Sequence, residues 1–139
     1  MDFREDLLQT GFGFITTLFE KYGEFFPVAV VIQAEDKESA FLATEAEEEQ
    51  PESVQVFEDL KNAIREGAAK GDYLAGAIFY DCRITHPDTN EKTDAVAVFY
   101  ESADTPLAEQ HFYPYQFSAQ QLPVYEEGYY EEQEKEMFC

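Results

Sequence analysis

Positive charge is scarce in this sequence, which contains nine Lys and Arg residues against 30 Asp and Glu residues and has a formal net charge of −21. Nucleic acids and anionic membranes bind proteins through clustered Lys and Arg side chains, so the composition argues against both as partners. A basic protein would instead be attracted to this chain. The alternative interpretation is that the acidic residues only keep the protein soluble.

Cysteine and long apolar stretches are also scarce. Two cysteines, Cys82 and Cys139, are too few for a disulfide framework and are typical of a reducing compartment. The longest apolar stretch, residues 25–32, is interrupted by Pro27 and falls short of the ~20 residues that a membrane helix needs. The first residues have neither the basic start nor the apolar centre of a signal peptide. We therefore expect a cytoplasmic protein.

Sequence motifs for catalysis are absent, since the chain contains no GxSxG, no SxxK and no phosphate-binding loop. Cys82 lies in a predicted strand with only Arg83 as a basic neighbour, so we expect a small buried side chain rather than a reactive thiol. Asp81, Arg83 and Asp94 would meet across a predicted hairpin, either as an acid–base pair or as a partly buried salt bridge. The salt bridge is the simpler interpretation, and we assign no catalytic residue.

Two weak patterns bear on metal binding. The run from Asp88 to Asp94, DTNEKTD, places oxygen ligands at alternate positions, but it lacks the Gly and the bidentate Glu of a calcium loop and contains a lysine. Cys82, His86 and His111 would supply three zinc ligands if neighbouring strands brought them together. Their spacing matches neither CxxC nor HExxH, so we expect no metal and no cofactor.

Residues 72–101 read DYLAGAIFYDCRITHPDTNEKTDAVAVFYE and predict a β-hairpin at the centre of the fold. Alternate side chains of a strand point to opposite faces. In the first predicted strand, the alternate residues that begin with Leu74 stay apolar. The alternate residues that begin with Tyr73 become polar from Asp81 onward. We therefore expect the first strand to be covered on both faces at its start and on one face at its end. Turn-forming Pro, Asp and Asn residues within positions 86–93 connect the two strands.

The remaining periodic segments predict two helices and three more strands. The predicted helices are 2–23, which Asp2 can cap, and 51–70, in which Pro51 fits the first helical position. Gly23 and Gly71 end these helices, and the predicted strands are 25–33, 40–44 and 108–117. The order is α-β-β-α-β-β-β, an α+β fold with an antiparallel sheet of about five strands and two helices packed on it. Gly11 and Gly13 predict a weak point in one continuous first helix. Pro114 requires an edge position or a strand end.

Residues 1–120 are predicted to form a single domain, followed by an acidic, Tyr-rich tail at 121–139. This tail would be part of the same domain or mobile, with an acidic amphipathic helix as an alternative structure. Tyr is enriched at binding surfaces because it combines a large contact area with a polar tip. The candidate partner surface therefore consists of Tyr113, Tyr115, Tyr125, Tyr129 and Tyr130. The alternative is that the first two tyrosines only close the core while the tail is solvated.

Several short stretches together resemble a known pattern. The segments Phe25-Phe26-Pro27 and Pro51-Glu52-Ser53, followed by AIFYDCRI, TDAVAVFYE and YPY, are similar to a family of small uncharacterised bacterial proteins over roughly residues 20–117. That family carries no established activity, so the resemblance implies no catalytic residue. The order of elements is also similar to that of profilin-like and roadblock-type modules, an analogy of fold that implies no function.

These features favour a non-enzymatic protein-interaction module, comparable to an inhibitor or an immunity protein that binds a basic toxin. The first alternative is a structural subunit that forms homodimers through a sheet edge or the first helix. The second is a small-ligand-binding domain or enzyme with a pocket between sheet and helices, which would require polar groups that converge in a concavity.

Overall fold

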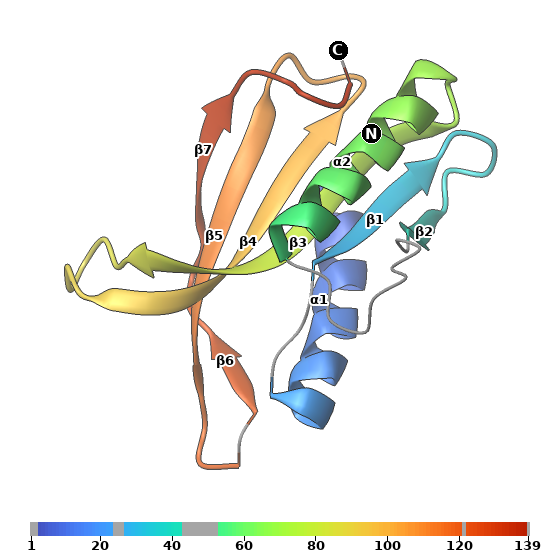
Figure 1. Ribbon diagram of the computed structural model, residues 1–139. Coiled ribbons are helices and arrows are strands. Elements are labelled where there is room, and N and C mark those ends of the chain that lie inside the picture. Colours follow the sequence, from blue (N-terminus) through green and yellow to red (C-terminus); the bar gives the residue numbers. More distant parts are fainter. Residues whose placement is uncertain (1–2, 24–26, 43–52, 121, 139) are drawn as a thin grey trace.

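The computed structural model of the chain describes residues 3–23, 27–42, 53–120 and 122–138. Two helices and seven strands follow one another along these residues (Figure 1). Their bounds are α1 Arg4–Tyr22, β1 Val28–Gln33, β2 Ser39–Leu42, α2 Ser53–Ala69, β3 Tyr73–Thr85, β4 Lys92–Ser102, β5 Ala108–Phe117, β6 Pro123–Tyr125 and β7 Tyr129–Gln133. The predicted α+β class and the predicted order of the first seven elements are confirmed.

The strands form one antiparallel sheet in the order β2-β1-β3-β4-β5-β6, and β7 also pairs with β5. Its centre is the predicted hairpin, in which β3 and β4 pair without interruption from Ala75 opposite Ser102 to Thr85 opposite Lys92. The far end of this hairpin extends beyond the body of the sheet (Figure 1). β2 and β7 lie at opposite sides of the sheet.

The two helices cover opposite faces of the sheet, because alternate side chains of the central strands are apolar on both faces. Phe79 and its neighbours on one face pack with α1, through Leu7, Ile15 and Phe19. Ile78 and its neighbours on the other face pack with α2. The alternation fails at the start of β3, where a register shift opposite β1 turns Tyr73 toward α2 and Leu74 toward α1. This β-bulge reverses the two faces that strict alternation predicts for those residues.

α1 is one continuous helix, as predicted, and its glycines explain how it approaches the sheet. A Cβ atom at Gly11 would lie 2.1 Å from Cζ of Phe79, so only glycine allows this contact. Gly23 ends the helix with a left-handed φ of 73° and donates its N–H to the Phe19 carbonyl at 2.9 Å. Gly71, which follows α2, also has a positive φ of 79°.

Pro114 lies within β5, which is not an outer strand of the sheet, and this corrects the expectation of an edge position or a strand end. β5 pairs with β4 on one side, while on the other side β7 covers residues 108–112 and β6 covers residues 115–117. Pro114 therefore falls between β7 and β6. Its carbonyl accepts the N–H of Glu126 at 2.7 Å, so its main-chain polar atoms face away from β4 and the missing N–H removes no bond to β4.

The C-terminal tail contributes two strands, which raises the strand number from the predicted five to seven. The structure does not show the predicted acidic helix, since residues 123–125 and 129–133 are strands that pair with β5, and Met137 and Phe138 pack on the sheet. Asp2, the predicted strand ends 25–26 and 43–44, and Pro51 lie outside the described residues. No helix within the described ranges is long and apolar enough to cross a membrane.

Candidate functional site

The strongest candidate for a functional surface is the sheet edge formed by β7. β7 pairs with β5 from Phe112 opposite Tyr129 to Ala108 opposite Gln133. Over the described residues no strand pairs with its other side. Because directly opposite residues share a face, Tyr130 and Glu132 point to the α1 side of the sheet, and Tyr129, Glu131 and Gln133 point to the α2 side.

A buried charged cluster lies beneath this edge on the α1 side. Glu109 and His111 of β5 are only 7% and 6% exposed. One carboxylate oxygen of Glu109 forms an ion pair with Nη2 of Arg4, and the other lies 2.8 Å from Nε2 of His111. The Arg4 guanidinium also lies 5.5 Å from the centre of the Tyr100 ring. The cluster connects the start of α1 to β5, the strand with which β7 pairs.

Aromatic stacking fixes β7 on this cluster. The ring of Tyr130 stacks on the His111 ring with a centroid distance of 4.9 Å, and the Tyr113 ring lies nearly parallel to the His111 ring at 6.2 Å. Burial lowers the pKa of His111 below its usual value of 6.5, although the hydrogen bond to Glu109 acts in the opposite direction. His111 is therefore a neutral, buried ring that supports β7.

Glu101 anchors the chain that follows β7. Its carboxylate is fully buried and accepts the backbone N–H groups of Glu136, Met137 and Phe138 at 2.8–3.1 Å. Met137 is 2% exposed and packs in the cluster beneath α2. The Arg65 guanidinium donates to the Glu136 carbonyl at 2.7 Å, which adds a bond to α2. This role of Glu101 was not predicted, and the sequence signals it only by a glutamate at the end of an apolar strand.

The five predicted tyrosines do not form one surface. Tyr115 is 5% exposed and donates its hydroxyl to Asp81 at 2.9 Å. Tyr125 packs its ring edge-on against Phe12 and lies 2.8 Å from the Thr16 hydroxyl. The Tyr115 ring thus lies in the core beneath α1, and the partly buried rings of Tyr113 and Tyr125 pack against this core.

The other two tyrosines lie on opposite faces of β7. Tyr129 packs against Phe112 at a centroid distance of 5.4 Å. Tyr130 is 54% exposed, so it is the one of the five with a largely accessible ring. A partner-binding role for these residues stays a prediction, and the geometry favours Tyr130 for it.

The remaining candidate residues are dispersed. Arg83 and Asp94 form a long pair, Nε to Oδ1 3.8 Å, with both side chains more than half exposed, so it is not the partly buried salt bridge that was expected. Burial raises the pKa of Cys82 to about 11, which keeps the thiol protonated and unreactive. His86 lies 3.3 Å from Glu126 rather than near His111. Within the described part of the chain, no three His, Cys, Asp or Glu side chains are grouped to hold a metal ion.

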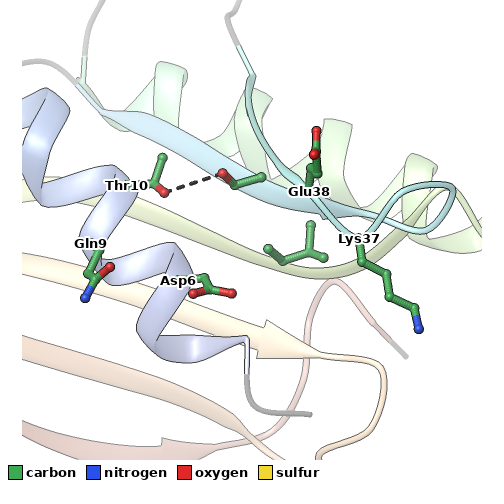
Figure 2. Close-up of a pocket in the computed structure, with 7 residues that line it drawn as sticks. Asp6, Gln9, Thr10, Lys37 and Glu38 are labelled. Atoms are coloured by element: carbon green, nitrogen blue, oxygen red, sulfur yellow. Dashed lines mark hydrogen bonds between the residues drawn. The ribbon is translucent and has the colours of Figure 1, made fainter.

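A groove of about 330 Å³ lies between α1 and the β1–β2 turn. Figure 2 shows Asp6, Gln9 and Thr10 on the helix side of the groove and Lys37 and Glu38 on the turn side. The Thr10 hydroxyl lies 3.4 Å from the Ser39 hydroxyl and joins the two walls. Five of the seven lining residues are exposed and only Ile32 is buried, so the groove holds its polar groups in contact with solvent. Such a lining favours a shallow surface feature over an enclosed ligand site.

Comparisons with protein-family models, with curated proteins and with solved structures find no significant match to this chain. The resemblance to small uncharacterised bacterial proteins therefore stays a prediction, and the function has to be argued from the geometry of this chain alone.

Proposed function

We propose that this chain is a non-enzymatic interaction module that binds a basic protein partner, as inhibitors and immunity proteins bind basic toxins. A cytoplasmic location, where such a protein would neutralise its target, belongs to the same proposal.

The observation that carries the proposal is where the acidic side chains lie. Among the Asp and Glu residues that the structure describes, only Glu101 and Glu109 are buried. Each of these two has a structural task, because Glu101 holds the C-terminal segment and Glu109 pairs with Arg4. The remaining described carboxylates are accessible to solvent and can steer a cationic protein toward the surface.

A non-enzymatic role is supported by the burial of the cluster in which His111 lies beside Glu109 and Arg4. His111 and Glu109 are less than a tenth exposed, and the rings of Tyr113 and Tyr130 stack with the imidazole. A general base has to reach the proton that it removes from a substrate. The geometry supports a structural role for this cluster.

Capture followed by a salt titration tests the proposed function. The immobilised chain is exposed to a soluble extract at about 10 mM salt, and each captured protein is then purified and its affinity measured at about 10 and 150 mM NaCl. We expect a basic protein whose affinity falls at least tenfold over this range, because steering between opposite charges is screened. A partner whose affinity is unchanged by salt, or the capture of no protein, would contradict the proposal.

A second candidate function, a homodimeric structural subunit, is favoured by one apolar pair at the other side of the sheet. Phe41 of the β2 edge strand is 48% exposed and lies 4.9 Å, centroid to centroid, from Phe14 of α1, which is 37% exposed. Edge strands with exposed apolar residues are prone to pair with another chain. Light scattering that shows a monomer at high protein concentration would remove this candidate, and a dimer that Phe41→Ser dissociates would support it.

A further inference from the structure

We infer that the outer edge of β7 binds an extended basic segment of the partner by β-strand addition. This inference rests on the proposed function, and it specifies where the partner binds and what kind of segment is bound. In this mode of recognition a peptide pairs its backbone with an exposed sheet edge, while its alternate side chains meet those of the edge strand.

The edge of β7 is held in place before any partner arrives. Ahead of the strand, the Gly128 backbone approaches Tyr113 so closely that a Cβ atom would lie 2.3 Å from the ring. Within the strand, Tyr130 stacks on buried His111. After the strand, the Glu101 carboxylate binds three consecutive N–H groups and Met137 is buried. A strand fixed at both ends loses little conformational entropy on binding, which favours its use as a template.

The charges along this edge determine which segment it accepts. Glu132 and the exposed Tyr130 ring lie on one face, and Glu131 lies on the other, so an added strand meets a carboxylate on either face. Lys or Arg at successive positions of the segment would form cross-strand ion pairs with these carboxylates. A cation beside Tyr130 would gain a cation–π contact as well.

A second copy of this chain is a poor occupant of the same edge. Pairing β7 with β7 would bring the Glu131 and Glu132 side chains of two copies together, and like charges across a strand pair are destabilising. The same repulsion protects the edge against uncontrolled pairing. Charge thus allows a basic segment and disfavours self-association.

The test uses a fluorescent peptide of about eight residues with alternating Lys-Lys and Thr-Thr pairs, which places cations on both faces of the added strand, and its binding to the full chain is followed by anisotropy. The double variant E131K/E132K should weaken binding by about tenfold or more. The control variant E35K/E38K makes the same change in net charge at the exposed β1–β2 turn and should weaken binding by about twofold or less. Equal losses in the two variants would overturn the inference, because they would show attraction to the whole surface.

Peptide methylation tests the backbone contacts on the unaltered protein. Methyl groups on the N–H of every odd residue, or of every even residue, leave the peptide charge unchanged but remove donors from one side of the strand. One of the two peptides should lose binding by about tenfold or more and the other should retain it. Equal affinities of the two methylated peptides would overturn the inference.

The outcome separates this inference from the proposed function. A captured basic protein whose salt-sensitive affinity is unaffected by E131K/E132K would sustain the proposed function and overturn the β7 site. If the wild-type chain does not bind the alternating peptide, the β7 site is also overturned.

Discussion

Two glycines of α1 that are two positions apart, Gly11 and Gly13, have very different surroundings. A Cβ atom at Gly11 would meet the Phe79 ring, whereas one at Gly13 would meet nothing within 4 Å. We expect Gly11→Ala to destabilise the protein by about 1–3 kcal/mol, because the ring or the helix has to move in a packed core. Gly13→Ala should stabilise it by up to about 1 kcal/mol, since alanine favours the helix. Urea unfolding of both variants measures the difference, and equal effects would contradict the close contact.

His111 makes stability depend on pH near neutrality. Burial lowers its pKa in the folded protein, with Arg4 also disfavouring the charge and Glu109 favouring it. As the pH falls, His111 binds a proton near pH 6.5 in the unfolded chain but only at a lower pH in the folded protein. The stability of the folded protein is therefore highest above pH 6.5 and falls as the pH drops toward the folded pKa of His111. His111→Phe keeps a stacking ring but does not titrate. The free energy of unfolding, measured from about pH 8 to about pH 5.5, should therefore fall more steeply in the wild type, and parallel curves would contradict this.

The segment that follows β7 depends on one carboxylate. Glu101→Gln replaces an oxygen acceptor by an amide N–H₂ that faces the N–H groups of residues 136–138. At least one buried N–H then lacks a partner, which should cost about 1–3 kcal/mol of unfolding free energy. Glu91→Gln, at an exposed turn position, is the matched control and should change the stability by less than about 0.5 kcal/mol.

Hydrogen exchange measures the effect of Glu101→Gln at the segment itself. Amides 136–138 should exchange faster in this variant while those of β3 and β4 stay protected, because the segment opens locally. Unchanged exchange at residues 136–138 would show that Glu101 does not hold them.

Elements with a strong local pattern could be predicted from the sequence, and those held by distant contacts could not. The hairpin of β3 and β4 follows from alternation of side chains, and Gly23 marks the end of α1 by its left-handed φ. By contrast, β7 is a polar segment with no apolar alternation, and its conformation depends on pairing with β5. The polar residues that support it, Arg4 and Glu109, are 105 positions apart. Local sequence carries no signal for such a pair.

The same limit explains why the predicted tyrosine surface is divided. Composition indicated that tyrosines are concentrated in the last third of the chain, but only the sheet register assigns each one to a face. Strand β5 turns Tyr115 into the core, and β7 turns Tyr130 outward. The sequence does not determine the pairing register of a short strand that lacks a clear apolar face.

The charge of the whole molecule makes its stability dependent on salt. An accessible surface of 8513 Å² shared among 21 net negative charges gives roughly 400 Å² for each charge, a mean spacing of about 20 Å. The screening length is about 30 Å at 10 mM salt and about 8 Å at 150 mM. Neighbouring charges therefore repel one another strongly only at the lower salt concentration.

We expect the midpoint of thermal unfolding to rise between about 10 and 150 mM NaCl, by about 2–8 °C for each 1 kcal/mol of relieved repulsion. Unfolding separates the charges and releases this repulsion, so salt stabilises the folded chain relative to the unfolded one. Replacing Glu20, Glu66 and Glu127 by Gln removes three exposed charges and should reduce the dependence on salt. A midpoint that is independent of salt in the wild type would show that the carboxylates are already neutralised by local contacts, and the electrostatic steering invoked for the proposed partner would be weakened with it.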